Sequence, residues 1–404
     1  MSRLKRTIVA LYLFIAFADA AGKALATNPG INRALTAWVS AASAADVRGA
    51  ARPSGNFEIF RTASQHLVSG MDLYAEYPAK HSDRFKYSPT FALLFAPFAW
   101  IPSPIALFFW SALNAFVLFA AVERVLPGRA GLLAMLCLLL EVLRGMQNAQ
   151  SNALVAGLII LAFAALERAN AWRAAGAVML GACVKIFPLA ALSFAVPRRL
   201  TLRTGLWAGA IGAGLVALPL LVLSPSQLAE QYVSWQGVES IDAHQRWFSV
   251  MALVHRWTGT PWPNWPIQFA GTLALLAPLI IRRDRWDDAR FRFLYLCSLL
   301  LYVVLFNHQA ERASYLIAFV GATLWFAGSP SERWRTWLYG LAFLTIPLMS
   351  TLIPGAILRT QLATLYRLAL PTLVIWLAVQ WELMRANGPA SANRQSGAQG
   401  SATV

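Results

Sequence analysis

Acidic and imidazole side chains gather in one polar segment near the start of an otherwise apolar chain. Residues 56–98 read NFEIFRTASQHLVSGMDLYAEYPAKHSDRFKYSPTFALLFAPF. The candidate acids and bases in this segment are Glu58, Asp72, Asp83, His66 and His81. A carboxylate or an imidazole can remove a proton from a hydroxyl group. We expect Glu58 to do so from the start of a helix at the rim of the bilayer, and Asp72 to orient the loop.

The flanking residues predict how this segment folds. The apolar spacing of NFEIFRTASQHL predicts an amphipathic helix on the membrane surface, which Gly70 ends. A simple interfacial lid is the alternative interpretation. Ser88 and Pro89 have the residue types of a helix N-cap and first turn. Lys86 and Tyr87 would then lie at the level of lipid phosphates.

Side-chain amides are dense in a second segment, EVLRGMQNAQSN, which spans residues 141–152. Its candidate binding residues are Gln147, Asn148, Gln150 and Asn152. Such amides either bind a polar headgroup or join helices by hydrogen bonds, and the sequence leaves both open. Lys185 lies within an apolar run, where a cation is costly and indicates function unless it snorkels to the interface.

Two further segments contain groups that could bind phosphate. In FNHQAERASYLIA, His308 and Glu311 lie three residues apart and would share a helical face. This spacing is weak evidence for a metal. The alternatives are that Glu311 and Arg312 pair with neighbours, or that His308 and Arg312 bind a phosphate. In SWQGVESIDAHQRWFSV, Arg246 can donate two parallel hydrogen bonds to a phosphate, and His244 lies two residues before it. The alternative is that this segment only forms part of the belt of aromatic residues at the membrane interface.

The composition indicates a membrane protein with many helices. Hydrophobic residues make up 58% of the 404 residues and charged residues 13%, about half the usual share in soluble proteins. The net charge of +16 arises from short basic loops, which fits the positive-inside rule better than nucleic-acid binding. No P-loop, dinucleotide motif, nucleophile elbow or zinc signature occurs in the sequence. We therefore expect no cofactor and no metal.

The apolar runs predict an all-α, polytopic membrane domain over residues 1–385, with about twelve helices and a range of ten to thirteen. The N-terminus, the basic loops 197–203, 282–292 and 331–336, and a disordered tail at 386–404 are expected in the cytoplasm. The long loops 28–88 and 224–264 are expected outside. The predicted helices cover 7–26, 88–101, 104–122, 130–144, 150–167, 172–196, 205–223, 265–281, 291–307, 312–328, 334–354 and 364–384.

A series of motifs resembles glycosyltransferase family 87. The motifs are NFEIF, SGMDLY, FKYSPTFALLFAPFAWIP, LFFWSALNAF, QNAQSNALVAGLIILAF and CVKIFPLAAL, and the resemblance runs from about residue 56 to 325. It implies the GT-C membrane fold, a polyprenyl-phosphate sugar donor, an active site on the outer face and inversion at the anomeric carbon.

The resemblance also implies roles for single residues. Family members carry an Asp base in the first loop, and the matching position here is Asn56, which cannot act as a base. Glu58 or Asp72 would take over that role. His308 matches a later His-containing stretch and is implied as a phosphate or acceptor contact, while Lys185 matches a K-x-x-P motif.

We therefore expect a hexosyltransferase of a bacterial-type inner membrane. It would transfer a sugar, with mannose as the first expectation, from a polyprenyl phosphate to a lipid-linked or cell-envelope glycan. Membrane lipids would surround it, and we expect no nucleic-acid partner. A transporter or flippase of a lipid-linked glycan is the alternative, and a non-catalytic family member is a third possibility raised by Asn56.

Overall fold

The computed structural model describes residues 3–26, 55–81, 83–352 and 360–385. These residues are all helix, turn or loop without a strand, which confirms the predicted all-α class. The first half of the long loop 28–88 and the tail at 386–404 lie outside the described residues.

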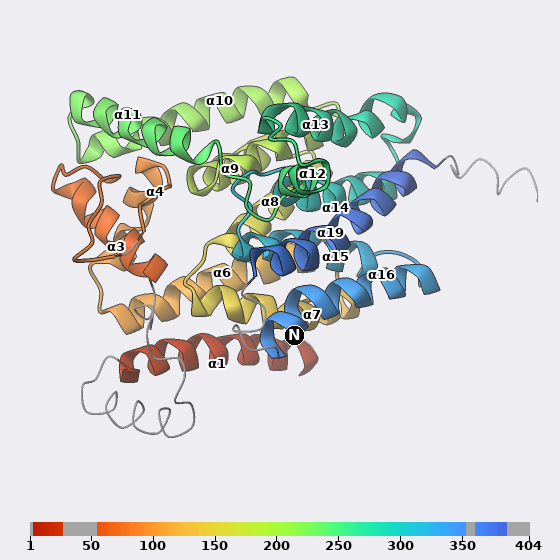
Figure 1. Cartoon of the computed structure of the whole chain (residues 1–404), viewed down its shortest axis with the longest axis horizontal. Coiled ribbons are helices and arrows are strands. Elements are labelled where there is room, and N and C mark those ends of the chain that lie inside the picture. The colour runs from red at the N-terminus through yellow and green to blue at the C-terminus, as the bar shows by residue number, and fades with distance from the viewer. Residues whose placement is uncertain (1–2, 27–54, 82, 353–359, 386–404) are drawn as a thin grey trace, which may run out of the picture.

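The long helices run side by side through one bundle (Figure 1). The α-helices are α1 (Arg3–Ala26), α3 (Gly55–Val68), α4 (Pro89–Leu94), α5 (Ala96–Ala99), α6 (Ser103–Val125), α7 (Arg129–Gln147), α8 (Asn152–Glu167), α9 (Ala171–Val184), α10 (Thr201–Ala217), α11 (Pro225–Asp242), α12 (Val250–Thr258), α13 (Asn264–Ile281), α14 (Ala289–Leu305), α15 (Tyr315–Ala327), α16 (Arg333–Phe343), α17 (Met349–Leu352) and α19 (Gln361–Met384). The 3₁₀-helices are η1 (Phe187–Ala195), η2 (Leu218–Leu221), η3 (Arg283–Arg285) and η4 (Arg312–Ser314), and η5 (Leu344–Leu348) is a π-helix.

Six stretches in the described residues are long and apolar enough to cross a bilayer, which supports a multi-pass membrane protein. These stretches are Arg3–Ala26, Ser103–Val125, Arg129–Gln147, Thr201–Leu221, Asn264–Ile281 and Leu362–Met384. The predicted number of about twelve helices is not confirmed, because two predicted helices fold differently.

The predicted helix 88–101 does not run through the bundle. It is broken into α4 and α5, of six and four residues, which are too short to cross a bilayer. Pro97 in α5 lacks the N–H that a continuous helix needs at this point. Arg61 of α3 donates hydrogen bonds to the carbonyl of Ala99 and to Ser103, so this segment stays beside α3. Figure 1 shows α3 and α4 together at one end of the bundle.

The predicted helix 172–196 is a hairpin. α9 enters the bundle, and η1 returns to the end from which α9 came, because Arg198 just after η1 bonds to the carbonyls of Leu166 and Glu167 just before α9. The reversal falls at Lys185, next to Pro188, and proline disfavours continuation of the α-helix. Since neither segment crosses the bundle, the two differences cancel and the later loops keep their predicted sides.

The three predicted basic loops do meet at one end of the bundle. Arg199 pairs with Asp287 at 3.2 Å, which joins the first loop to the second. Arg335 pairs with Glu382 at 2.8 Å, and Arg290 of α14 approaches the same carboxylate at 3.6 Å. A shared end is what the positive-inside rule predicts for these loops.

Candidate active site

Aromatic packing fixes the first long loop against the bundle. The Phe60 ring of α3 lies 4.9 Å from the Tyr87 ring and 5.1 Å from Phe91, measured between centroids. It also contacts Phe95 at 5.4 Å and Trp110 of α6 at 6.0 Å. Edge-to-face pairs of this kind are favourable beyond their buried area. The predicted amphipathic helix therefore holds the backbone around Tyr87 in place.

The turn after α3 follows the sequence prediction. Gly70 has a φ of 67°, in the left-handed region that glycine adopts easily, and α3 ends just before it. Asp72 accepts a hydrogen bond from the backbone N–H of Tyr74 at 3.0 Å, and the Tyr74 hydroxyl donates to the carbonyl of Tyr87 at 2.8 Å. Asp72 thus orients the loop, as expected, through its contact with the backbone.

Helix α11 of the second long loop clamps the first. The amide of Gln231 accepts from the N–H of Leu73 at 3.0 Å and donates to the carbonyl of Met71 at 3.1 Å. One turn further along α11, the indole of Trp235 donates to the carbonyl of Lys86 at 3.2 Å. The two long loops therefore form one structure.

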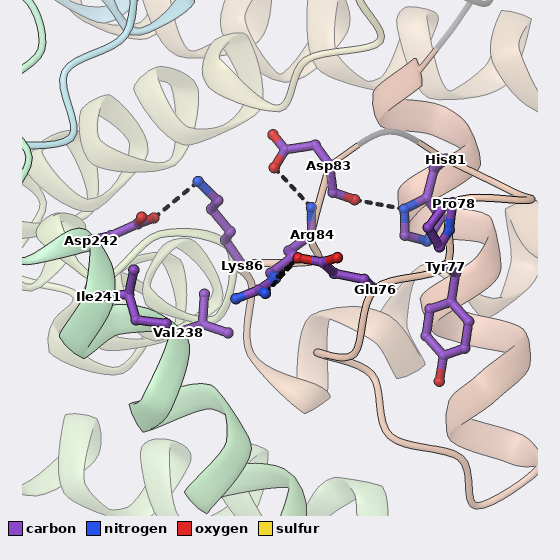
Figure 2. A pocket seen from close by; sticks show the side chains of 10 residues that line it. All are labelled: Glu76, Tyr77, Pro78, His81, Asp83, Arg84, Lys86, Val238, Ile241 and Asp242. Carbon is purple, nitrogen blue, oxygen red and sulfur yellow. Dashed lines mark hydrogen bonds and ion pairs between the residues drawn. The ribbon is translucent and has the colours of Figure 1, made fainter.

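An ion pair completes this clamp. Lys86 Nζ lies 2.9 Å from a carboxylate oxygen of Asp242, at the edge of a cavity of about 450 Å³ (Figure 2). Burial lowers the pKa of Lys86, but the hydrogen bond to Asp242 and the charges of Asp83 and Glu311 outweigh burial, so its pKa is raised. Lys86 is therefore a permanent cation between the two loops.

The amide segment and the lysine of the hairpin meet at the same end of the bundle. Asn56 donates a hydrogen bond to the carbonyl of Asn148 at 2.9 Å. Asn152 donates to the carbonyl of Ala313 at 2.9 Å and accepts one from Lys185 Nζ at 2.9 Å. Asn152 is therefore a link between segments, which answers part of the question that the sequence left open.

A cavity of about 280 Å³ opens among these segments, and we call it the central cavity. Its lining residues are Glu141, Arg144, Gly145, Asn148, Gln150, Glu311, Arg312 and Ala313. Polar side chains from the end of α7, from the turn before α8 and from the loop before α15 therefore face one space. Convergent polar groups in a concave pocket are a feature of ligand sites, where they orient the ligand.

Glu311 is the free carboxylate of this cavity. It is exposed and makes no side-chain hydrogen bond or ion pair within the ranges that the structure describes. Its charge acts on Lys86, Tyr87 and Lys185, so it lies within electrostatic reach of both the first loop and the hairpin. An accessible, unpaired carboxylate next to cations is suited to accept a proton from a bound hydroxyl.

Helix α3 turns Asn56 and Glu58 to opposite sides. An α-helix advances about 100° per residue, so two positions differ by about 200°. Arg61 and Gln65 share the side of Glu58, and both donate to the carbonyl of Ala99, at 3.0 and 3.5 Å. Asn56 instead reaches α7. Glu58 as a base remains a prediction, and it does not replace the missing carboxylate at the position of Asn56.

His308 lies beside the clamp. Its Nδ1 is 3.2 Å from Nε2 of Gln268, and its Nε2 is buried without a hydrogen-bond partner in the described part of the chain. Burial lowers the pKa of His308, although the charge of Asp242 acts in the opposite direction. His308 is therefore neutral near pH 7.

Two predicted site residues, His244 and Arg246, lie apart from this group, and a third, Gln147, does not line the central cavity. Arg246 donates to the carbonyl of Trp262 at 2.9 Å and to the side chain of Asn264 at 3.3 Å, so it holds the second loop together. It lines a separate cavity of about 490 Å³ with His244. Gln147 is exposed at the end of α7.

Sequence reasoning did not select Glu141, and it left Asp242 among several polar residues of the second long loop without naming a partner for it. Asp242 pairs with Lys86, and Glu141 lies within the apolar α7, where it is 1% exposed and pairs with Arg312 at 2.7 Å. An acid inside an apolar helix indicates a nearby cation, so Glu141 gave a usable signal. Sequence reasoning named Asp242 but did not indicate its pairing with Lys86, because the two residues are far apart in the chain.

Comparison with known proteins assigns the chain to a family. No curated protein matches the chain. The model of glycosyltransferase family 87 matches residues 85–307, more than half of the chain. The match begins just before Lys86, includes the amide segment, Lys185 and Asp242, and ends just before His308. The chain therefore belongs to glycosyltransferase family 87.

Proposed function

We propose that this glycosyltransferase moves a hexose from a polyprenyl phosphate to a lipid-linked or cell-envelope glycan, with inversion. Mannose is the first sugar to test. The observation that carries the proposal is the convergence of three polar segments, around Lys86, Asn152 and Glu311, at one end of a membrane bundle. A lipid-borne donor and a glycan headgroup would both reach such a site from the bilayer.

We place this site on the outer side of a bacterial-type inner membrane. The basic loops gather at the other end of the bundle, around Asp287 and Glu382, and the positive-inside rule assigns that end to the cytoplasm. A polyprenyl-phosphate donor already carries its leaving group, so transfer on this side needs no nucleotide.

Glu311 is the proposed base, in preference to the first-loop acids. It would take the proton of the acceptor hydroxyl as the hydroxyl oxygen attacks the anomeric carbon of the sugar. Glu58 faces the side of α3 that contacts Ala99, and Asp72 binds its own loop. Among these three carboxylates, Glu311 alone lines the central cavity.

The test is sugar transfer by the purified protein in liposomes. A panel of radiolabelled polyprenyl-phosphate sugars is offered with a membrane-lipid extract as acceptor, and both labelled product and released polyprenyl phosphate are measured. We expect at least one donor to give both. The proposal is contradicted if no donor gives labelled product or released polyprenyl phosphate. Movement of an intact lipid-linked glycan across the bilayer, without release, supports the flippase instead.

A further inference from the structure

Three arginines from distant parts of the chain meet beside the central cavity, and we call them the arginine cluster: Arg144, Arg312 and Arg367. Arg312 forms a two-pronged pair with the buried carboxylate of Glu141, at 2.7 and 3.0 Å. Arg144 lies one turn beyond Glu141 on α7 and donates to the hydroxyl of Thr351 at 2.9 Å.

Arg367 reaches the same place from α19. It donates to the carbonyl of Thr345 at 2.6 Å, and both Arg367 and Arg312 approach the carbonyl of Ile346 at 3.4 Å. The charges of Arg144 and Arg312 act on Arg367, so the three guanidinium groups are close enough to repel one another.

The cluster has more positive charge than its surroundings neutralise. Glu141 pairs with Arg312, and the carboxylate of Glu311 lines the same cavity, so three cations face two anions. Arg144 and Arg367 have no carboxylate partner within the described ranges. The Nε atoms of Arg312 and Arg367 are buried there without an acceptor. Buried donors without acceptors and an unmatched charge call for an anion.

We propose that the arginine cluster binds the phosphate group of the lipid-linked donor, an inference that rests on the proposed function. Guanidinium groups present paired donors that match phosphate oxygens. Arg144 and Arg312 line the same cavity as Glu311, so the phosphate and the base would share one site.

The charges in the reaction explain why arginines suit this position. The acceptor oxygen bonds to the anomeric carbon while the bond from that carbon to the phosphate oxygen breaks, and the acceptor proton passes to Glu311. The phosphate changes from a singly charged diester to a doubly charged monoester. Fixed cations at the leaving oxygen therefore stabilise the transition state more than the bound donor.

Binding of polyprenyl monophosphate to the purified protein in detergent tests this assignment without requiring transfer. We expect R144Q and R367Q each to weaken binding at least tenfold, and R144K to weaken it less. R124Q is the matched control, because Arg124 is exposed on α6 and contacts one backbone carbonyl. Single replacement of Arg312 would leave Glu141 buried without a partner, so R312Q is made together with E141Q. Thermal unfolding in detergent verifies that each variant is folded.

Two other ligands test whether the cluster binds the phosphate of the donor lipid or the headgroup of any anionic lipid. Inorganic phosphate should compete with polyprenyl monophosphate on the natural protein and lose this ability in R367Q. Phosphatidylglycerol should bind more weakly. Equal binding of phosphatidylglycerol, with the same losses in the variants, would make the cluster a site for bulk lipid headgroups and overturn the assignment. Unchanged affinity in R144Q and R367Q would also overturn it, even if the natural protein transfers sugar.

Discussion

Lys86 and Asp242, which lie far apart in the sequence, form an ion pair of 2.9 Å that joins the two long loops. Their side chains are 33% and 14% exposed, so the pair lies at the edge of the site without being fully buried. The contact holds Lys86 on the same end of the bundle as Glu311.

We expect D242N to lower transfer at least tenfold but to lower the free energy of unfolding by only about 1 kcal/mol, because ion pairs that are still partly open to water contribute little stability. Kinetic assays and unfolding in detergent measure the two effects. The double variant K86Q/D242N should be no worse than the poorer single variant. Independent losses that multiply would show that the two residues do not act together.

Gln231 should matter for stability. It is 5% exposed and bonds to both Leu73 and Met71, so Q231A would leave the buried N–H of Leu73 and the partly buried carbonyl of Met71 unpaired. We expect a loss of about 2 kcal/mol in the free energy of unfolding. Q236A, an exposed position on the same helix, is the control. An equal loss of free energy of unfolding in the two variants would show that the hydrogen bonds of Gln231 do not stabilise the first loop.

Lys185 should matter for transfer more than for stability. The substitution K185M removes a hydrogen bond to Asn152, but it also removes a positive charge from an apolar hairpin. The free energy of unfolding should therefore change by no more than about 1 kcal/mol. Transfer should fall at least tenfold, and K185R should retain part of it. A large loss of stability with unchanged activity per folded molecule would assign Lys185 a structural role only.

His308 should make the fold sensitive to acid. Its pKa is lowered by burial, so the unfolded chain binds a proton first as the pH falls below about 6.5. The folded state therefore loses stability from that pH down to the lowered pKa of the folded protein. The unfolding midpoint should fall more between pH 7 and 5.5 in the natural protein than in H308Q. If the unfolding midpoints of the two proteins fall equally over this pH range, His308 is not the source of the acid sensitivity.

Local features of the fold could be predicted from the sequence, because they depend on neighbouring residues. Gly70 ends α3, and the hydroxyl of Ser88 accepts from the N–H of Phe91 at 3.1 Å with Pro89 in the first turn, as expected. The opposite directions of Asn56 and Glu58 also follow from helical geometry and were available from spacing alone.

The hairpin and the distant contacts could not be predicted in this way. The run from 172 to 196 is as apolar as a crossing helix, and only Lys185 and Pro188 mark its reversal. The role of Arg246 depends on Trp262 and Asn264, which periodicity cannot bring together with it. The arginine cluster likewise depends on how α7 and α19 pack.

The central claim is that Glu311 takes the proton of the acceptor, and the transfer kinetics of E311Q test it most directly. The same substitution is made in E58Q and, as a control on an exposed carboxylate of α11, in E230Q. The account predicts that E311Q lowers kcat by about 10²–10⁴-fold with little change in the KM for the donor, while E58Q and E230Q remain near the natural rate. Transfer that survives in E311Q and collapses in E58Q would contradict the account and return the base to the first loop.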